Sequence, residues 1–266
     1  MGQCSGASLL ITLKEGALTL HALVDETLYA TTQWGIYAIN AQNGQIRWLY
    51  QSDTLSIVSG PPLVADRLLY AGTSAGFDRP QRSHVHAPRT SAGLPRPPAP
   101  TGNSGKAYFC ALDVATGAEV WRYPMGHYIG AVVHDETIYV NSGDCSLSAR
   151  EKQSGRLRWH HQFGASASYP ATIANDVLYI NINSNGAYAL RSEDGAVLWH
   201  QPLGNSPGTP GDSFTFDAPV VLDGAVYLVC FNRRARGVLY ALDARTGAEC
   251  WHTPYPPSGA LLAVAQ

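Results

Sequence analysis

The sequence of 266 residues predicts an all-β protein built from five copies of one four-stranded unit. Three observations lead to this prediction. A Gly stands four residues ahead of a Trp five times, an Ala stands ten residues ahead of each of these Trp, and no segment shows a helical period. A fixed period marks a repeat architecture, here with a unit of about forty residues and insertions in two of the units. The pairs are Gly44 and Trp48, Gly117 and Trp121, Gly155 and Trp159, Gly195 and Trp199, and Gly247 and Trp251.

The first strand of each unit is a short apolar run that ends at a turn residue. In the fifth unit the run is APVVL at 218–222, followed by an Asp. Asp and Asn tolerate the left-handed backbone conformation, so a tight turn is expected after each run. The turn residues are Asp25, Asp66, Asp135, Asn175 and Asp223.

The second strand carries an apolar residue followed by Tyr, as in VYLVCF at 226–231. Aromatic and β-branched residues favour a half-buried strand. The third strand alternates in character, as in IYAIN at 36–40, and the fourth holds the Trp, as in AVLWHQ at 196–201. Between these two strands, a five-residue string ending in Gly supplies the positive φ that a hairpin with a bulge requires. The repeated Trp and Tyr are interpreted as core packing.

A four-stranded meander of this length cannot bury both of its apolar faces alone. Stacking the units around an axis gives each face a neighbour, and this arrangement is the β-propeller. Packed sheets lie about 10 Å apart, so the repeated Ala is expected to leave room for an indole. We therefore expect a single propeller domain over 1–266. Its five complete blades are predicted at about 15–50, 55–124, 126–162, 164–202 and 212–254.

One orphan strand is predicted at each end of the chain. The segment LLITL at 9–13 occupies the position of a fourth strand, and LLAVA at 261–265 matches the first strand of a further blade. The two segments either share an incomplete sixth blade or belong to a larger ring, and the sequence leaves both arrangements open.

Every insertion falls on one face of the predicted disc. In a meander, the connections from second to third strand and from fourth to next first strand lie on the same face. The insertions there are a Pro-rich segment at 76–105, predicted to be disordered, and the connections at 202–217 and 231–236. Long loops on a rigid scaffold often carry binding residues. The insertions on this face are also rich in Arg, so we predict that it is a basic face that binds a partner. Its candidate residues are Trp34, Arg79, Arg82, Arg89, Arg96, Lys106, Phe214, Phe216, Arg233, Arg234 and Arg236. The alternative is a solvated, Arg-rich linker.

The short motifs and the spacing of His and Cys residues indicate no catalytic or metal site. The string GTSAG at 72–76 has the spacing of a nucleophile elbow, but an elbow needs a strand that runs into a helix. His84 and His86 lack the further ligands of a zinc site. The five cysteines show no metal-binding spacing, and an odd number does not favour a disulfide framework. A formal net charge of −2 gives no general attraction to nucleic acid or to anionic membranes, so a protein partner is expected.

The sequence shows no signal peptide and no transmembrane stretch. The chain as it stands is therefore expected in the cytoplasm, or its natural start lies further upstream. The compartment and the oligomeric state stay open.

Three strings resemble the pyrroloquinoline-quinone-type propeller repeat, in a resemblance that covers about 15–254. They are VLYALDARTGAECW at 238–251, AYFCALDVATGAEVW at 107–121 and GIYAINAQNGQIRW at 35–48. This repeat occurs in quinoprotein alcohol and glucose dehydrogenases and in the propeller lipoprotein of the bacterial outer-membrane assembly machinery. Such a resemblance predicts the fold, whereas the function depends on the site.

The resemblance implies that quinone-binding members place a vicinal Cys-Cys disulfide over the cofactor, and the sequence has no adjacent cysteines. We therefore expect no cofactor and a non-catalytic binding scaffold like the bacterial assembly propeller, from a family that is mostly extracytoplasmic. One alternative is a fragment of a quinoprotein oxidoreductase, which would bind the quinone with Ca²⁺. A second alternative is a sensory or ligand-binding propeller of a larger signalling protein.

Overall fold

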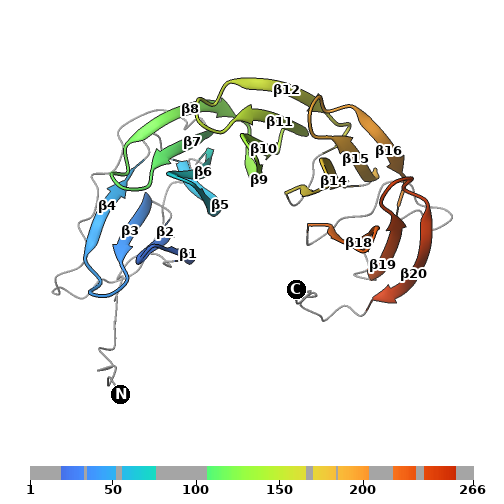
Figure 1. Ribbon diagram of the computed structural model, residues 1–266, viewed down its shortest axis with the longest axis horizontal. Helices are drawn as coiled ribbons and strands as arrows, with labels where there is room; N and C mark the ends of the chain where they lie inside the picture. Colours follow the sequence, from blue (N-terminus) through green and yellow to red (C-terminus); the bar gives the residue numbers. More distant parts are fainter. Residues whose placement is uncertain are drawn as a thin grey trace, which may run out of the picture. The chain divides into compact units, whose positions relative to one another are not determined.

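A computed structural model describes eight segments of the chain, and its described residues form strands and turns without a helix (Figure 1). The strands assemble into five four-stranded antiparallel sheets, numbered here in chain order as blades 1 to 5. The described residues are 19–32, 35–51, 56–75, 107–165, 170–183, 185–203, 218–231 and 237–255. The prediction of an all-β propeller with five complete four-stranded blades is confirmed. The predicted orphan strands at 9–13 and 261–265 lie outside the described residues.

The chain divides into two compact units, Met1–Pro124 and Met125–Gln266. The first unit holds blades 1 and 2, and the second holds blades 3, 4 and 5. In each blade the four strands pair in chain order, including β6 and β7, which are separated by the insertion at 76–106. The single domain that the sequence suggests stays a prediction.

The strands have the following bounds. Blade 1 contains β1 (Thr19–Val24), β2 (Thr27–Thr32), β3 (Gly35–Asn40) and β4 (Ile46–Tyr50). Blade 2 contains β5 (Ser56–Ala65), β6 (Leu68–Ala75), β7 (Ala107–Asp113) and β8 (Glu119–Met125). Blade 3 contains β9 (Tyr128–His134), β10 (Thr137–Ser142), β11 (Ser146–Glu151) and β12 (Leu157–Gln162). Blade 4 contains β13 (Thr172–Ala174), β14 (Val177–Ile182), β15 (Gly186–Arg191) and β16 (Val197–Gln201). Blade 5 contains β17 (Val220–Leu222), β18 (Ala225–Phe231), β19 (Gly237–Asp243) and β20 (Glu249–Tyr255).

The predicted turn residues adopt the left-handed conformation that the sequence requires of them. The φ angle of the Asp or Asn after the first strand lies between 44° at Asp25 and 53° at Asp66, and that of the repeated Gly between 69° at Gly155 and 74° at Gly195. A register shift marks a bulge in the third-to-fourth strand pair of blades 1, 3, 4 and 5. Turn and bulge together set the register of each hairpin.

The repeated Ala stands directly opposite the repeated Trp on the neighbouring strand. Ala38 pairs with Trp48 and Ala189 with Trp199 across the sheet, and both alanines are completely buried. A larger side chain at this position would meet the indole, which explains the small residue. The same pairing holds for Ala149 with Trp159 and for Ala241 with Trp251.

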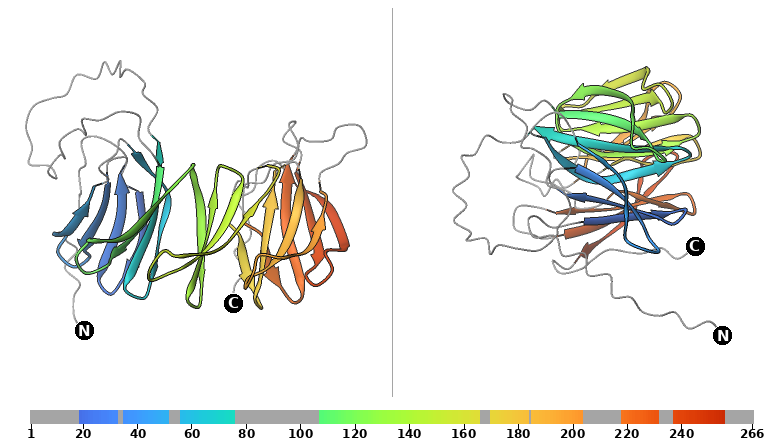
Figure 2. Two further views of the ribbon diagram at one scale, coloured as in Figure 1. Left: turned by 90° about the horizontal axis from the view of Figure 1, so that it is seen from above. Right: turned by 90° about the vertical axis from the view of Figure 1, so that its left-hand side faces the viewer.

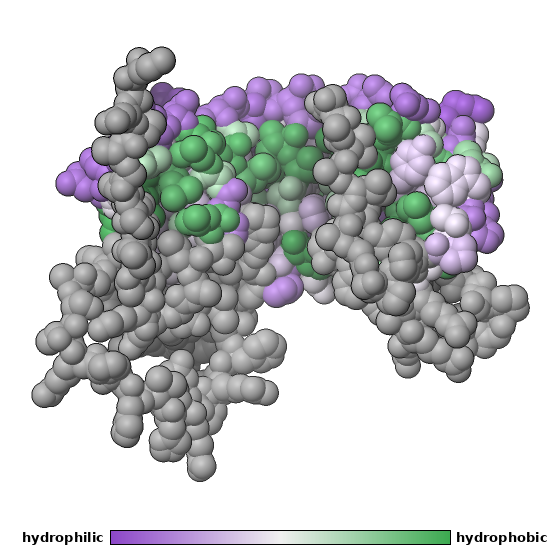
Figure 3. Space-filling model, turned by 90° about the horizontal axis from the view of Figure 1, so that it is seen from below, coloured by the Kyte–Doolittle hydropathy of each residue, from purple (hydrophilic) through white to green (hydrophobic). Residues whose placement is uncertain are grey.

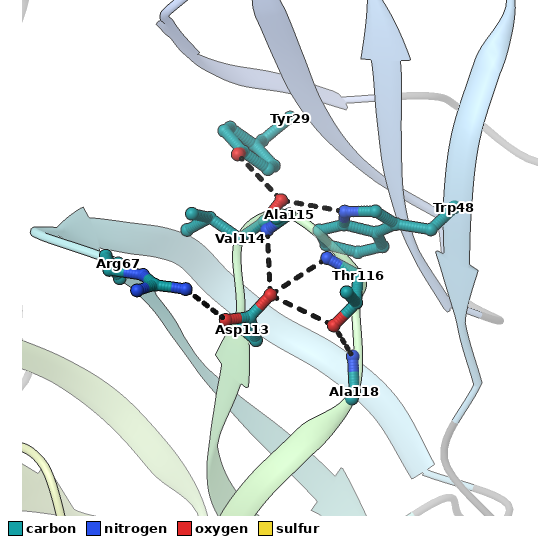
Figure 4. A network of polar contacts seen from close by, with 8 residues as sticks. All are labelled: Tyr29, Trp48, Arg67, Asp113, Val114, Ala115, Thr116 and Ala118. Atoms are coloured by element: carbon teal, nitrogen blue, oxygen red, sulfur yellow. Dashed lines mark hydrogen bonds and ion pairs between the residues drawn. The ribbon is translucent and has the colours of Figure 1, made fainter.

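Blades 1 and 2 are joined by an indole that docks onto a backbone turn (Figure 4). The Trp48 Nε1–H of blade 1 donates to the carbonyl of Val114 in blade 2 at 2.9 Å, and the Tyr29 hydroxyl donates to the same oxygen at 3.5 Å. The indole lies flat over Gly117, where a Cβ would come within 2.7 Å of it. Two conditions thus require a glycine at position 117: the positive φ angle, and the indole of the preceding blade, which leaves no room for a Cβ.

The second unit repeats this contact between blades 3 and 4 and between blades 4 and 5. The Nε1–H of Trp159 donates to the Ser192 carbonyl at 2.8 Å, and that of Trp199 donates to the Ala244 carbonyl at 2.9 Å. The Tyr hydroxyl of the same blade donates to each carbonyl as well, from Tyr139 at 3.2 Å and Tyr179 at 3.3 Å. We call this contact, with its Trp, Tyr, carbonyl and Gly, the blade junction.

Trp251 departs from the pattern of buried indoles. Its exposed fraction is 45%, whereas Trp48 and Trp199 expose 8% each. The interpretation of every repeated Trp as core packing is therefore wrong at this position. The reason is that blade 5 has no following turn among the described residues.

The turn that receives the indole is organised by an Asp side chain in blades 2 and 5. Asp113 Oδ1 accepts hydrogen bonds from the N–H of Ala115 and of Thr116 and from the Thr116 hydroxyl, each at 3.0 Å (Figure 4). The Thr116 hydroxyl, the largest cause, holds the pKa of Asp113 below its ordinary value, and Thr246 does the same for Asp243. Blade 1 places Asn40 in this role, where Oδ1 accepts the N–H of Gln42 at 2.8 Å.

These Asp residues predict a loss of stability in acid. A carboxyl whose pKa is lower in the folded than in the unfolded state contributes stability above its unfolded pKa, and this is lost as the pH falls through the folded value. Their contribution to the melting temperature should therefore stay level above about pH 5 and fall below it. In the double variant Asp113→Asn and Asp243→Asn, which copies Asn40, the fall should be shallower. Thermal unfolding from pH 7 to pH 3 tests this; parallel curves would show that the two carboxylates do not contribute.

Candidate partner-binding face

The strands of each blade are connected at two opposite ends, which we call its edges, and the connections at the two edges differ (Figure 2). At one edge, the turn edge, the first strand joins the second and the third joins the fourth, always through two or five residues. At the other edge, the loop edge, the second strand joins the third and the fourth leads to the next blade. The longest connections are all at the loop edge. The three that exceed five residues are 76–106 between β6 and β7, 163–171 between β12 and β13, and 202–219 between β16 and β17.

All of the predicted binding residues lie outside the described residues. These are Trp34, Arg79, Arg82, Arg89, Arg96, Lys106, Phe214, Phe216, Arg233, Arg234 and Arg236. The strands that flank them are described, and they end at the loop edge: β2 at Thr32, β6 at Ala75 and β18 at Phe231. The assignment of these residues to a binding face stays a prediction.

The turn edge is polar and exposed. Asp25, Glu26, Gln42, Asp66 and Asp135 are all exposed at its turns. Figure 3 shows hydrophilic side chains at one end of the described blades, with hydrophobic side chains beside them. The turn edge therefore offers charged groups on short and uniform supports.

Buried polar side chains support the loop edge from below. Thr73, exposed by 2%, accepts the N–H of Tyr108 through its hydroxyl at 2.9 Å and thereby closes the strand pair that holds the longest insertion. In blade 3, Asn141 is 1% exposed, and its Oδ1 accepts the N–H of Ala171 in blade 4 at 3.2 Å. A buried amide that bonds the next blade fixes the start of that blade at this edge.

The equivalent contact from blade 4 to blade 5 is incomplete. Asn181 corresponds to Asn141, because each follows the repeated Tyr by two residues, and Pro219 corresponds to Ala171, four residues before the turn residue. Proline has no N–H, and within the described part of the chain the buried Oδ1 of Asn181 has no hydrogen-bond partner. Its Nδ2 instead approaches Cys230 Sγ at 3.7 Å.

This comparison predicts the effect of Ala171→Pro. The substitution should destabilise the protein by about 1–3 kcal/mol, since it leaves the buried Asn141 Oδ1 without its donor. Ala171→Gly is the matched control, because it keeps the N–H and removes only a methyl group. Urea denaturation measures both, and equal losses would mean that this hydrogen bond adds nothing to stability.

The described cysteines are placed as structural residues. Cys110 lies in β7 and Cys230 in β18, and burial raises the pKa of both thiols to about 12. A thiol with so high a pKa stays protonated and is a weak nucleophile. Of the other two described cysteines, Cys145 occupies the short turn between β10 and β11 with a φ of 67°, and Cys250 is exposed on β20.

The described residues do not fit the quinone cofactor that the resemblance associates with this repeat. The four described cysteines stand singly on different strands and turns, so no vicinal pair is available to cover a quinone. Among the described residues there is also no group of three or more His, Cys, Asp or Glu side chains arranged to hold a metal ion. This part of the chain thus supplies no vicinal cysteine pair and no such group of side chains.

A family model described as outer membrane protein assembly factor BamB matches residues 101–261, more than half of the chain. No curated protein matches the sequence. The described part of the chain has no helix of sufficient length and hydrophobicity to cross a membrane.

Solved structures share the fold at low sequence identity. BamB from Moraxella catarrhalis has a TM-score of 0.65 at 17% identity, over 90% of this chain and 62% of that one. A europium-containing methanol dehydrogenase has a TM-score of 0.61 at 13% identity, over 89% of this chain and 61% of that one. The quinohemoprotein alcohol dehydrogenase from Comamonas testosteroni also has 0.61, at 14% identity, over 91% of this chain and 44% of that one. The chain therefore spans less than two thirds of the length of these proteins.

Proposed function

The chain belongs to the family of the outer membrane protein assembly factor BamB, and from this premise we propose that it is a non-catalytic propeller that binds a protein partner through its loop edge. One observation carries this proposal: the turn edge of every blade is closed by two or five residues, whereas the long connections all leave from the loop edge. Loops of different length on rigid strands can follow the shape of a partner, and uniform short turns cannot.

The chemistry of the described residues supports binding more than catalysis. The thiols of Cys110 and Cys230 are buried and protonated, and the buried polar groups near the loop edge, such as Thr73 and Asn141, are engaged in backbone hydrogen bonds. These groups stiffen the ends of the strands. The candidate face adds Arg, Phe and Trp, residue types that are enriched where proteins bind each other.

By its family, the partner is expected to be a component of outer membrane protein assembly, and the place of action the cell envelope. Such a role needs no chemical step by the propeller. It needs a rigid support that holds several loops in a fixed relation.

Photo-crosslinking from the two edges tests the proposal. A photoreactive amino acid is placed at Trp34, Phe214 or Arg234 of the loop edge, and in matched controls at the exposed turn-edge residues Glu26, Ala115 or Glu193. In cells that naturally make the protein, the loop-edge positions should crosslink to one common protein identified by mass spectrometry. Crosslinks from the turn edge alone would contradict the proposal.

A second experiment addresses the basic residues of this face. The triple variant Arg233→Ala, Arg234→Ala and Arg236→Ala should bind the crosslinked partner more weakly and with a smaller dependence on salt, because fewer charges are then screened. An unchanged salt dependence would remove these arginines from the interface.

The similarity in fold to methanol and alcohol dehydrogenases favours one other candidate, a quinone-binding fragment. A ligand that binds only the folded state raises stability by about 2.7 kcal/mol at one hundred times its dissociation constant. Adding pyrroloquinoline quinone with Ca²⁺ should leave the melting temperature unchanged if the chain is a binding scaffold. A rise that saturates with quinone concentration would establish the dehydrogenase alternative instead.

A further inference from the structure

A stack of four aromatic rings crosses from blade 3 to blade 4 near the loop edge. It begins at His161 on β12, where the ring centroids of His161 and Phe163 are 4.5 Å apart. The ring of Phe163 meets that of Tyr188 on β15 edge-on at 5.3 Å. Tyr188 in turn stacks on the imidazole of His200 on β16, with the centroids 4.1 Å apart and the planes at 12°. The stack therefore connects the last strand of blade 3 to the last two strands of blade 4.

The imidazole of His161 is directed at an apolar core. Phe163 is 7% exposed and belongs to the core cluster of these two blades, and Tyr188 packs against the same cluster. His161 pairs across the sheet with Leu147, which is completely buried in this cluster. Directly paired residues point to the same side of a sheet, so the half-buried imidazole faces the cluster as well.

His161 occupies a repeated position, two residues after the repeated Trp. In the other blades this position holds Tyr50, Tyr123, Gln201 and Thr253. Of these residue types, only His normally changes its charge between pH 5 and 8. The junction of blades 4 and 5 packs without a His: Leu203 takes the place of Phe163, is 4% exposed, and shares a cluster with Tyr240. A His is thus not required for packing here.

No negative charge compensates a proton on His161. In the described part of the chain, no carboxylate forms an ion pair with this residue. Burial, the largest cause, and the charge of the neighbouring His160 lower the pKa of His161, whereas the nearby carbonyl of Gly195 in blade 4 raises it to a smaller extent.

The other titratable groups of this contact are neutral or cationic. Burial raises the pKa of Tyr188 and of Tyr139, the tyrosine that β10 contributes to the cluster, so both hydroxyls stay protonated. His200 donates or accepts at the carbonyl of Asn185, at 2.7 Å, and carries no negative charge. The remaining strands contribute apolar side chains to the cluster, apart from the indole N–H of Trp159, which is bonded to main chain. A charged imidazole would therefore be desolvated without a counter-charge, which is unfavourable.

We propose that this stack is a pH-sensitive contact between blades 3 and 4, closed while His161 is neutral and loosened when His161 is protonated. Phe163 transmits the change, because its ring lies against His161 and its N–H donates to the Cys145 carbonyl at 2.8 Å. Loosening the stack releases residues 163–165, where the chain leaves β12 at the loop edge. The device is part of the fold and needs no partner.

Urea unfolding of the parent and of His161→Gln, from about pH 7.5 to about pH 5.5, tests the proposal. Gln copies Gln201 of the next blade and cannot titrate. Since the pKa of His161 is lower in the folded state, its neutral form contributes stability above the unfolded value of about 6.5, and this is lost as the pH falls toward the folded value. The unfolding constant of the parent relative to the variant should therefore rise below that pH, by up to about tenfold per pH unit, the limit for one proton.

His160→Gln is the matched control. His160 is exposed on the opposite face of the same strand, and its charge is only the second cause of the lowered pKa of His161. This variant should keep most of the rise. If it lost the rise while His161→Gln kept it, the effect would belong to His160 and the proposal would be overturned.

Two local measurements need no loss of the fold. By NMR, the imidazole of His161 should titrate at a lower pH in the folded parent than in the urea-unfolded chain. Hydrogen-exchange protection of the Phe163 N–H should fall with pH in the parent and stay level in His161→Gln. Parallel unfolding curves, equal titration in the folded and unfolded chains, or an equal fall of protection in both proteins would each contradict a contact controlled by His161.

Discussion

Replacing Gly247 with Ala should destabilise the protein by about 2–5 kcal/mol, the sum of backbone strain and overpacking. Gly247 has a φ of 72°, which costs an L-residue energy, and an added Cβ would lie 2.6 Å from the indole of Trp199. The indole cannot retreat easily, because its Nε1–H is bonded to the Ala244 carbonyl at 2.9 Å. The backbone strain and the overpacking therefore both arise from the added Cβ atom.

The chain offers a control that separates them. Gly224 has a φ of 76°, yet a Cβ there would meet nothing within 4 Å. Gly224→Ala should thus cost only the strain, about 1–2 kcal/mol. Urea unfolding of both variants gives the difference, which measures the contact with the indole. Equal losses would show that Trp199 does not rest on this Gly in solution.

Replacing Trp199 with Ala should cost about 3–5 kcal/mol, the range for a large aromatic side chain removed from a core. The indole is 8% exposed and packs in the core cluster shared by blades 4 and 5. Trp199→Phe should lie between the parent and the Ala variant, because it keeps much of the ring and loses the donor to Ala244. Thermal and urea unfolding measure the three proteins.

Trp251→Ala is the matched comparison, since Trp251 has the same place in its blade and stands opposite the corresponding Ala, Ala241. It should cost less than about 1 kcal/mol, because removal of an exposed side chain has little effect. If the two Trp variants lost the same stability, the exposure of Trp251 would not describe the protein in solution.

Most of the fold could be predicted because the sequence pattern of one four-stranded unit occurs five times. Turn residues such as Asp25 and Gly44 need a positive φ, and few residue types tolerate one, so their positions fix the ends of the strands. The alternation of apolar residues then assigns the faces. The Ala opposite each Trp was also predictable, since packed sheets leave a limited space between them.

The blade junction could not be predicted from the Gly and Trp spacing. Gly117 and Trp121 lie in one string, yet the indole over Gly117 is that of Trp48 from the preceding blade. A spacing along the chain carries no information on which blade supplies the partner. The exposure of Trp251 was missed for the same reason, because its string is like the others and only its neighbour differs.

The sequence predicted at which edge of the blades the candidate site lies, but not how its side chains are arranged. The topology shows that the long connections leave from the loop edge, and this follows from strand order alone. The side chains in those connections have no periodic partner, so no pattern fixes where they point. The unpaired Oδ1 of Asn181 was a missed signal that the sequence did contain, since Pro219 stands where blade 4 has an N–H.

The indole of each junction binds main chain, and this has a consequence for how such proteins change. The residue that offers the carbonyl is Val114, Ser192 or Ala244, three side chains with little in common. Substitutions there leave the contact intact, provided that the Gly three residues later is kept. One unit can then be exchanged for another, duplicated or deleted without redesign of its neighbours, because every copy brings its own indole and its own receiving turn.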